Sequence, residues 1–566
     1  MRWIYLDDWG SKMSFLNQTI GALLDEVSER LADKEAMVYA DRPVRYTYRQ
    51  LRQASDQVAK ALIGLGIKKG DTIALWATNV PEWVLLQLGS AKMGAILVTV
   101  NTQYQASELE YLLKQSDSTT IFLVERFKQS DYVGIFNAIL PELREHPRGK
   151  VLEFPSLPKL RHGILLSEQS VPGLLNWSEF LSLGEAVSDE TLRTYQDATS
   201  PEEVINIQYT SGTTGFPKGV MLTHINIVNN ANAVADAMNL KEEDRLCFPV
   251  PLFHCFGCVM SSLACVTKGA TMVPIEYFEP HAVLEAVERE QCTALHGVPT
   301  MFIAELEALK TKTYDTGTLR KGIMAGSPCP VEVMKQVITT MGMEEVTIAY
   351  GQTEASPVIT QTRIDDPLER RVATVGRNLD GIEVKIVDPA TGETLPYGQQ
   401  GELCARGYSI MAGYYNMPEA TRQAIDEEGW LHTGDLAVMD EEGYCNITGR
   451  LKDMIIRGGE NIYPREIEEF LYRHPKIADV QVVGLPDVKY GEEVCAVIRL
   501  REGEKMTAEQ VREFCRGQIA HHKIPRYVDF VQDYPVTASG KIQKYRLRDV
   551  YIDKYRLTEA AGIVTA

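Results

Sequence analysis

The chain has 566 residues, of which 45% are hydrophobic and 24% charged, and this composition predicts a globular protein with more than one domain. Its formal net charge of −19 argues against nucleic acid or an anionic membrane as the main partner. Ten scattered cysteines are too few for a dense disulfide framework and are typical of a reducing compartment.

The start of the sequence carries no evident targeting signal. The stretch MRWIYLDDWGSKMSF lacks the basic segment and apolar run of a signal peptide, and it is not Arg- and Ser-rich like a transit peptide. We therefore expect a cytoplasmic location. A later stretch, residues 248–266, has no formal charge, but its two prolines make it a poor membrane-spanning helix. We predict a buried segment of a large core there and no integral membrane segment.

Helical and extended patterns alternate over the first 130 residues. Thr47 and Gln50 have the spacing of a capping box, which predicts a helix that begins there and runs towards Gly64. A strand at 71–77, a helix at 80–94 and a strand at 95–101 follow at the spacing of a βαβ unit. The alternation resumes from 204 to 360, so we predict an α/β fold with mainly parallel sheets.

The pattern changes after about residue 375, where short β patterns with frequent Gly, Asp and Pro predict antiparallel sheet. A compact α+β pattern follows from residue 464 to the end of the chain. We therefore predict a large N-terminal domain at 1–451 and a small C-terminal domain at 452–566.

The stretch YTSGTTGFPKG at 209–219 has the residue types of a phosphate-binding loop. Its glycines let backbone N–H groups converge on oxygens, its hydroxyls add donors, and Lys218 supplies positive charge. A P-loop ATPase is disfavoured, because the glycines are too close together and Gly219 follows the lysine where Ser or Thr is needed. A flexible polar loop is the alternative, which the fixed Pro-Lys-Gly ending disfavours.

The segment YTSGTTGFPKGVMLTH resembles the signature loop of the adenylate-forming superfamily, which includes acyl-CoA synthetases, peptide-synthetase adenylation domains and luciferases. Five more segments match in the family's order: YGQTE, GELCARG, WLHTGDLA, GRLKDMIIRGGENIYPREIE and PVTASGKIQK. The resemblance spans residues from about 20 to 550. The most similar subgroup is that of the fatty acyl-CoA synthetases, with acyl-CoA synthetase family member 2 and bacterial medium- and long-chain ligases.

The resemblance implies the architecture as well as the class. The N-terminal adenylation domain would combine parallel α/β subdomains with a small β-barrel-like subdomain. The α+β C-terminal domain would be mobile and would rotate about a hinge at Lys452.

The implied reaction has two halves. A carboxylate attacks the α-phosphate of ATP to give acyl-AMP and pyrophosphate, and the thiol of CoA then attacks the acyl carbonyl and releases AMP. Mg²⁺ would be the cofactor, with ATP, CoA and a carboxylic acid as small-molecule substrates. Glu354 would ligate Mg²⁺, with Thr214 as a weaker ligand. The residues that the resemblance implies as catalytic are Lys541, Thr353, Glu354, Lys218 and His254.

The resemblance also implies three groups of binding residues. The nucleotide would contact Thr210, Ser211, Gly212, Thr213, Thr214, Gly215, Lys218, Gly326, Ser327, Pro328, Ala349, Tyr350, Gly351, Gln352, Thr353, Asp435, Ile447, Arg450 and Lys541. CoA would contact Arg457, Gly458, Gly459 and Glu460, and the acyl pocket would contain His254, Gly257, Val298, Met301, Ala325 and Gln352.

Several alternatives stay open. The enzyme could load a carrier protein instead of CoA, or act on a cyclic or aromatic acid, although small and apolar pocket residues favour a medium- to long-chain aliphatic one. A zinc site at His254, Cys255 and Cys258 is disfavoured because no second ligand pair follows at finger spacing. A non-catalytic binding protein of the same fold is disfavoured because the implied catalytic residues are all present. The oligomeric state is open, with a homodimer as one possibility.

Overall fold

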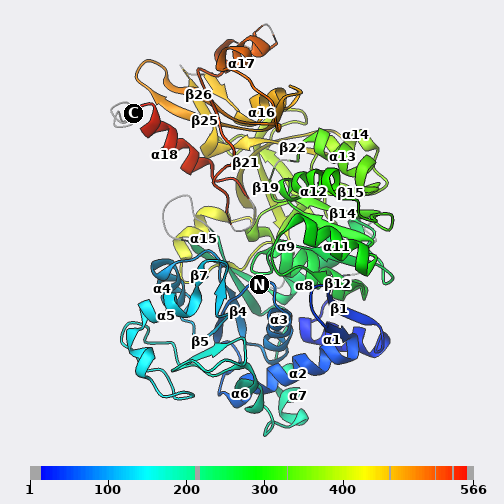
Figure 1. Ribbon diagram of the computed structural model, residues 1–566, viewed down its shortest axis with the longest axis vertical. Helices are drawn as coiled ribbons and strands as arrows, with labels where there is room; N and C mark the ends of the chain where they lie inside the picture. Colours follow the sequence, from blue (N-terminus) through cyan, green and yellow to red (C-terminus); the bar gives the residue numbers. More distant parts are fainter. Residues whose placement is uncertain are drawn as a thin grey trace.

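The computed structural model describes residues 15–210, 217–327, 329–457, 460–516, 518–519, 521–537 and 541–557. Within these ranges, the side chains of Lys452, Glu460 and Asn461 are not described. Figure 1 shows the chain coloured from blue to red, with the C-terminal elements at one end of the long axis.

The first sheet has seven strands, of which the five neighbours from β9 to β8 are parallel. The predicted βαβ unit is confirmed, because β3 and β4 pair in parallel and α3 (Pro81–Met93) connects them. In spatial order the strands are β20 (Gly413–Tyr414), β10 (Lys218–Thr223), β9 (Val204–Thr210), β4 (Ile96–Thr99), β3 (Thr72–Trp76), β5 (Thr120–Leu123) and β8 (His162–Leu165).

The second sheet has nine strands, of which six neighbours from β15 to β1 are parallel. Strands β13, β14 and β15 therefore end at the same edge, where the loops that follow them meet. In spatial order the strands are β17 (Arg377–Asn378), β16 (Val358–Gln361), β15 (Glu345–Gly351), β14 (Lys321–Ala325), β13 (Ala294–Gly297), β11 (Arg245–Phe248), β12 (Thr271–Pro274), β1 (Glu35–Tyr39) and β2 (Val44–Thr47).

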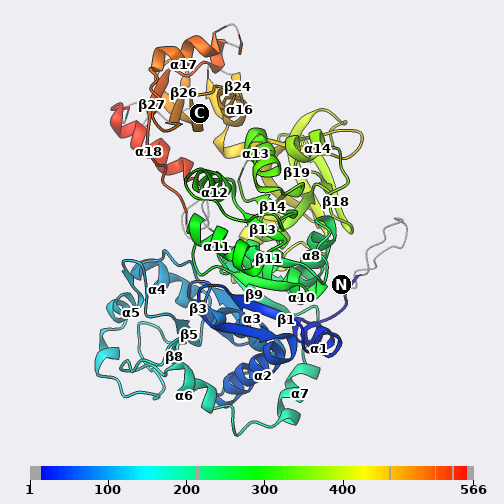
Figure 2. The same ribbon diagram turned by 45° about the vertical axis from the view of Figure 1, so that its right-hand side comes forward.

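Helices cover both sheets (Figures 1 and 2). Thr47 and Gln50 form the predicted capping box, and the helix that they open ends at Gly64 as expected. The longer helices are α1 (Ile20–Arg30), α2 (Tyr48–Gly64), α4 (Ala106–Gln115), α5 (Tyr132–Ile139), α7 (Asp189–Asp197), α8 (His224–Ala237), α11 (Pro280–Glu290), α12 (Pro299–Thr311) and α13 (Val331–Met341), with the shorter α6 (Trp177–Ser182) and α14 (Leu368–Ala373).

The uncharged stretch at 248–266 is a buried part of the core, as predicted. It forms the end of β11, a loop, the short helix α9 (Cys255–Gly257), a π-helical turn (Cys258–Leu263) and the start of α10 (Ala264–Lys268), and it packs against α8. Its prolines precede the helical part, where they lack the N–H groups that a continuous helix needs. In the part of the chain that the structure describes, no helix is long and apolar enough to cross a membrane.

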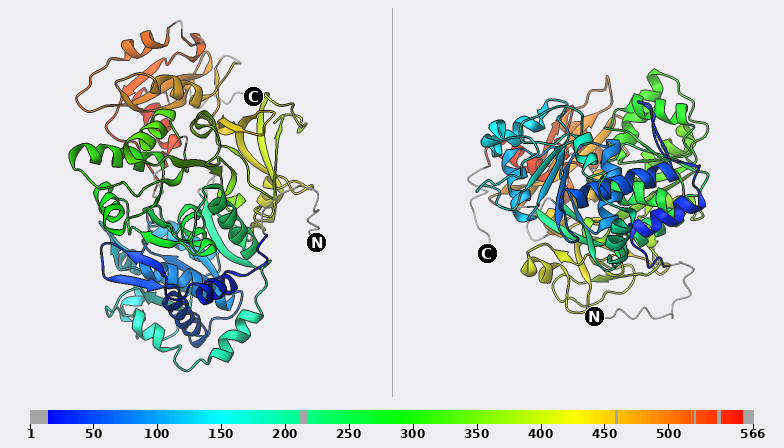
Figure 3. Two further views of the ribbon diagram at one scale, coloured as in Figure 1. Left: turned by 90° about the vertical axis from the view of Figure 1, so that its right-hand side faces the viewer. Right: turned by 90° about the horizontal axis from the view of Figure 1, so that it is seen from below.

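A third, antiparallel sheet follows at the side of the molecule (Figure 3). Its four strands are β18 (Ile382–Val387), β19 (Gln400–Gly407), β21 (Leu431–Met439) and β22 (Cys445–Arg450), with α15 (Pro418–Ala424) beside it. The antiparallel character agrees with the prediction, but the described strands do not close into a barrel, since β18 and β22 do not pair.

The C-terminal elements form an α+β unit with cores of their own. Two hydrophobic clusters contain only residues from Ile455 onward, whereas the large core of the preceding sheets ends with Ile447. The boundary at Lys452 remains a prediction. The elements are β23 (Ile455–Arg457), β24 (Glu460–Ile462), α16 (Pro464–Tyr472), β25 (Ile477–Asp487), β26 (Gly491–Leu500), α17 (Ala508–Cys515), β27 (Tyr527–Phe530) and α18 (Lys544–Lys554).

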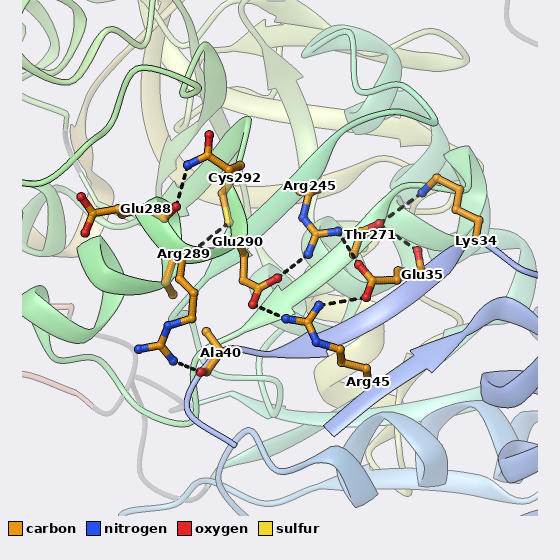
Figure 4. Close-up of polar contacts among 12 residues, drawn as sticks. Lys34, Glu35, Ala40, Arg45, Arg245, Thr271, Glu288, Arg289, Glu290 and Cys292 are labelled. Carbon is orange, nitrogen blue, oxygen red and sulfur yellow. Dashed lines mark hydrogen bonds and ion pairs between the residues drawn. The ribbon is translucent and has the colours of Figure 1, made fainter. Parts of the chain in front are cut away.

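A ring of four charged side chains joins the first hairpin to the centre of the second sheet (Figure 4). Glu35 on β1 pairs with Arg45 on β2 at 2.8 Å and with Arg245 on β11 at 2.7 Å. Glu290, at the end of α11, pairs with the same two arginines at 2.5 Å and 2.7 Å. The Glu290 side chain is only 4% exposed, so its charge depends on these partners.

We expect Glu290→Gln to lower the free energy of unfolding by about 2 kcal/mol, a value between those of exposed and buried ion pairs. The loss arises because both arginines lose a carboxylate partner. Glu242→Gln is the matched control, since Glu242 is 44% exposed and pairs with Arg30 at the surface; it should change stability by less than about 1 kcal/mol. Urea unfolding of the two variants compares them, and equal losses would contradict the structural role of the ring.

Candidate active site

Predicted site residues from several motifs gather where β13, β14, β15 and the third sheet meet. Val298 follows β13, Gly326 follows β14, and Thr353 and Glu354 lie in a short 3₁₀ turn (Thr353–Ala355) after β15. Asp435 lies on β21 opposite Arg450 of β22, in register.

Asp435 is held by two donors. The hydroxyl of Tyr350 donates to Asp435 Oδ2 at 2.8 Å, and Arg450 Nε donates to Oδ1 at 3.0 Å. Asp435 is only 6% exposed, so these charge-assisted bonds fix its side chain. Three of the predicted nucleotide-binding residues therefore form one network, with Ile447 on the strand that carries Arg450.

Glu402 supports the turn that carries Asp435. Its Oε1 accepts from the backbone N–H of Gly434 at 2.9 Å, and its Oε2 lies 2.9 Å from His432 Nδ1. Gly434 has φ +70°, a conformation that favours glycine. Sequence reasoning quoted both motifs, GELCARG and WLHTGDLA, without assigning this contact between them.

Glu402, Cys404 and His432 also place three donor atoms within 4.8 Å of one another, the one such group among the residues that the structure describes. Burial and Glu402 raise the pKa of the Cys404 thiol to about 12, which leaves it protonated. Because the oxygens of Glu402 already contact Gly434 and His432, the cluster is better explained as support for the turn.

Lys541 reaches this network from the C-terminal part of the chain. Its backbone N–H donates to Thr537 Oγ1 at 3.0 Å and its carbonyl accepts from the Thr537 N–H at 2.7 Å, so Thr537 fixes the backbone of Lys541. A Cβ added at Gly326 would lie 3.6 Å from Lys541 Cε, which places the lysine side chain at the end of β14.

Opposing influences act on the pKa of Lys541. Burial, and then the positive charge of Arg450, lower the pKa of Lys541 to about 8. The carboxylates of Asp435 and Glu354 act in the opposite direction and favour the charged form. The lysine thus lies within electrostatic range of residues from three separate motifs.

Tyr414 connects Glu354 to Lys218. The Tyr414 hydroxyl donates to Glu354 Oε1 at 2.8 Å, and Lys218 Nζ lies 4.6 Å from the centre of the Tyr414 ring. Among the described residues no lysine or arginine pairs with Glu354, so this carboxylate suits a hard cation. Tyr414 lies 60 residues after Glu354, and no sequence signal marked it.

His254 lies near Lys541 but keeps a structural contact of its own. Its Nδ1 accepts from the Phe256 backbone N–H at 3.2 Å and so caps α9. Burial, and then the charge of Lys541, lowers the pKa of His254 to about 3, so the ring is neutral at physiological pH. A neutral imidazole can accept or donate a proton in a hydrogen bond without adding charge to the site.

The two thiols beside His254 contact an amide that sequence reasoning missed. Cys255 donates to Gln208 Oε1 at 3.0 Å, and Gln208 Nε2 donates to Cys258 Sγ at 3.1 Å. Gln208 is 2% exposed and lies on β9, next to the predicted phosphate loop. This arrangement occupies both sulfurs and gives no support to a zinc site.

The predicted acyl-pocket residues lie in two places. Val298, Met301 and Ala325 are buried near the ends of β13 and β14. Gly257 has a packing role, because a Cβ there would lie 2.3 Å from the Pro251 carbonyl oxygen. Gly351 is constrained in the same way, with a Cβ 1.8 Å from the Pro357 carbonyl oxygen.

The ends of the predicted phosphate loop are held by α4. Tyr111 donates to the carbonyl of Pro217 at 3.1 Å, and Gln115 contacts the hydroxyl of Tyr209. Thr210 pairs with Lys218 across the hairpin. Outside the described residues lie Ser211, Gly212, Thr213, Thr214, Gly215, Pro328, Gly458 and Gly459, and with them the side chains of Lys452 and Glu460.

Arg457, predicted to contact CoA, is held within the C-terminal unit. Its guanidinium forms two bonds with Glu493, at 2.7 Å and 2.9 Å, and lies 4.4 Å from the centre of the Tyr490 ring. Glu493 is almost fully buried, so the arginine is fixed rather than free to move.

Comparisons with known proteins cover nearly the whole chain. The AMP-binding enzyme family matches residues 24–415, and the AMP-binding enzyme C-terminal domain matches residues 466–541. The YngI protein of Bacillus subtilis (strain 168), provisionally named an acyl-CoA synthetase, is 55% identical over 96% of this chain and 99% of its own. The mitochondrial medium-chain acyl-CoA ligase ACSF2 of Bos taurus is 44% identical over 94% of this chain and 87% of its own.

A solved structure shares the whole arrangement. The anthranilate CoA ligase AuaEII in complex with anthranoyl-AMP superposes with a TM-score of 0.82 at 26% identity, over 95% of this chain and 98% of that one. The predicted α/β fold class is therefore confirmed, without a closed barrel among the described strands.

The balance of charges around Lys541 can be measured. Labelling with an amine reagent across a pH series, followed by mass spectrometry, should show Lys541 titrating near pH 8. Arg450→Gln should raise that pKa, because it removes a positive charge and leaves the Asp435 carboxylate without a cationic partner. Lys523→Gln is the control, because Lys523 also lies in the C-terminal unit but pairs with Glu466. This variant should leave the pKa of Lys541 unchanged. An unshifted Lys541 in Arg450→Gln would mean that the two cations do not share one site.

Proposed function

The chain belongs to the AMP-binding enzyme family and is an AMP-forming acyl-CoA ligase, and we propose that it activates medium-chain aliphatic carboxylic acids. The observation that carries the catalytic part of the proposal is the position of Lys541, on the C-terminal unit, within electrostatic range of Asp435, Arg450 and Glu354.

In the proposed first half-reaction, the carboxylate of the acid attacks the α-phosphate of ATP and pyrophosphate leaves. Two anions must approach each other, and Lys541 would lie between them and lower their repulsion. Asp435 would accept hydrogen bonds from the ribose hydroxyls, with Tyr350 and Arg450 holding it in place. Thr353 would donate to the α-phosphate, and Lys218 would contact the outer phosphates.

Mg²⁺ fits the chemistry of the Glu354 carboxylate, and it would supply further positive charge at the phosphate oxygens. Tyr414 would orient Glu354 for this contact through its 2.8 Å hydrogen bond. Because the phenol is neutral, it leaves the negative charge of the carboxylate available.

In the proposed second half-reaction, the CoA thiol attacks the acyl carbonyl and AMP leaves. The C-terminal unit would rotate about Lys452, withdraw Lys541 and bring the RGGEN loop to the site. Arg457 would then meet CoA already fixed by Glu493 and Tyr490, which reduces the entropy lost on binding.

The proposal of medium-chain acids as substrates rests on the ACSF2 relatives and on the apolar residues predicted to line the acyl pocket. Val298, Met301 and Ala325 carry no charge and are buried, and Val298 and Lys541 both lie beside Gly326. His254 is neutral there, so a second carboxylate on the substrate would find no cation among these residues. The match to an anthranilate ligase favours an aromatic acid as the second candidate.

A panel of acids tests the proposal. We expect pyrophosphate release, measured with ATP, Mg²⁺ and CoA, to be fastest with unbranched acids of medium length and at least about tenfold slower with butyrate, palmitate and anthranilate. Lys541→Ala is the negative control and should release pyrophosphate about 10² to 10³ times more slowly. Fastest release with anthranilate would favour the aromatic candidate, and no release with any acid would overturn the proposed function.

A further inference from the structure

Glu305 is a buried acid without a partner. It lies on α12, its exposed fraction is 0%, and neither of its carboxyl oxygens has a hydrogen-bond partner among the described residues. Burial raises the pKa of Glu305 to about 8, so the group is mainly a neutral carboxylic acid at pH 7. An unpaired polar group in an apolar layer costs stability, which calls for an explanation.

Helix α12 begins at the reaction centre. Val298 is its N-cap residue, and a Cβ added at Gly326 would lie 3.2 Å from Val298 Cγ1 and 3.6 Å from Lys541 Cε. The first turn of α12 therefore lies beside the lysine that would hold the substrate carboxylate.

The face of α12 that carries Glu305 points at the second sheet. Met301 is four residues and Phe302 three residues before Glu305, so the three share one side of the helix. A Cβ added at Gly297 of β13 would lie 3.1 Å from Phe302 Cε2 and 3.5 Å from Met301 Cβ. Figure 2 shows α12 and α11 beside β11, β13 and β14.

Glu305 lies deeper in the same layer. It lies close enough to Cys247 of β11 that an ionised Glu305 would raise the pKa of that thiol, and Cys247 pairs with Leu295 of β13. Val298, Met301 and Glu305 thus follow one another along the side of α12 that faces the sheet.

The length of this layer suits a medium-chain acid. Glu305 lies seven positions after Val298, and a rise of 1.5 Å per residue gives about 10 Å. An extended chain covers about 1.2 Å per bond, so about 10 Å corresponds to roughly eight or nine bonds. An acid of that length whose carboxylate meets Lys541 would place its far end beside Glu305.

We propose that Glu305 is a distal polar subsite of the acyl pocket, and that the preferred substrates are medium-chain acids with a hydroxyl group at the far end of the chain. The proposal rests on the function proposed above. A neutral carboxylic acid donates one hydrogen bond and accepts others, as a hydroxyl does, so each would satisfy the other. A substrate with an ammonium group at the far end of the chain fits less well, because that ammonium and an ionised Glu305 would be two charges removed from water.

The chain supplies a matched control two residues away. Glu307 lies on the same helix but is exposed and pairs with Lys310 at 2.6 Å. Glu307→Leu therefore changes the same residue type on the same helix without touching the buried layer.

The experiment compares kcat/KM for pyrophosphate release with octanoate, decanoate and dodecanoate and with their terminally hydroxylated forms. The wild type should prefer one hydroxylated acid over its plain counterpart by about tenfold or more. Glu305→Leu should reverse that preference, Glu305→Gln should retain it because an amide also donates and accepts, and Glu307→Leu should not change it.

Thermal unfolding provides a readout besides activity. Without substrate, Glu305→Leu should melt at a higher temperature than the wild type, because it replaces an unpaired acid with an apolar side chain. The hydroxylated acid should raise the melting temperature of the wild type more than the plain acid does.

Equal kcat/KM for plain and hydroxylated acids in the wild type would overturn the subsite, even if Glu305→Leu failed to fold. A preference that survives in Glu305→Leu would also overturn it. A wild type that activates neither series would instead remove the proposed function, and with it the pocket on which the subsite depends.

Discussion

The proposed reaction depends on one electrostatic constraint. A substrate carboxylate and the α-phosphate of ATP, both anionic, must meet, and the positive charge that would lie between them comes from the C-terminal unit, whereas the rest of the site belongs to the preceding sheets. Lys541 is buried beside Arg450, which disfavours its charged form, and within range of Asp435 and Glu354, which favour it. The resulting pKa of about 8 leaves the lysine sensitive to what enters the site. Phosphate and carboxylate groups would both stabilise the ammonium form, so the charge would be strongest when the substrates are present.

Much of the surrounding structure keeps the partners of Lys541 in position. Asp435 is held by Tyr350 and Arg450. Glu402 on the neighbouring strand β19 holds the backbone of Gly434, which precedes Asp435. Glu354 is oriented by Tyr414. These contacts join all three sheets around the end of β15, which explains why motifs far apart in the sequence lie together in space.

The sequence was informative where the physical cause is local. The β3–α3–β4 unit, the capping box at Thr47 and the buried course of residues 248–266 depend on periodicity, capping and proline placement, and each was predicted. The family resemblance supplied the motif residues, because a motif preserves the residue types that a reaction needs. It could not supply Tyr414, Glu402 or Gln208, whose roles arise from contacts across different strands and loops. Their partners become visible only when the sheets are assembled.

Two residues show the limits of interpretation by residue type. Gly257 was predicted for the acyl pocket, yet its missing side chain is explained by the nearby Pro251 carbonyl. Glu305 is an ordinary helix residue by propensity and gave no signal in the sequence. Only its burial without a partner marks it, and that depends on how α12 packs on the sheet.

The central claim is that the described orientation serves acyl-AMP formation and must change before thioester formation. A Cβ at Gly449 would lie 3.7 Å from Tyr463 Cδ1 across the proposed hinge, so Gly449→Cys with Tyr463→Cys, joined through a short reducible bis-thiosulfonate linker, should fix this orientation by disulfide bonds. The ten native cysteines are buried and should not interfere. The decisive measurement is the rate of each half-reaction in the linked double variant, before and after reduction. The account predicts that acyl-AMP formation persists while acyl-CoA formation is lost until the disulfide bonds are reduced. Equal rates of acyl-CoA formation in the linked and reduced protein would contradict it.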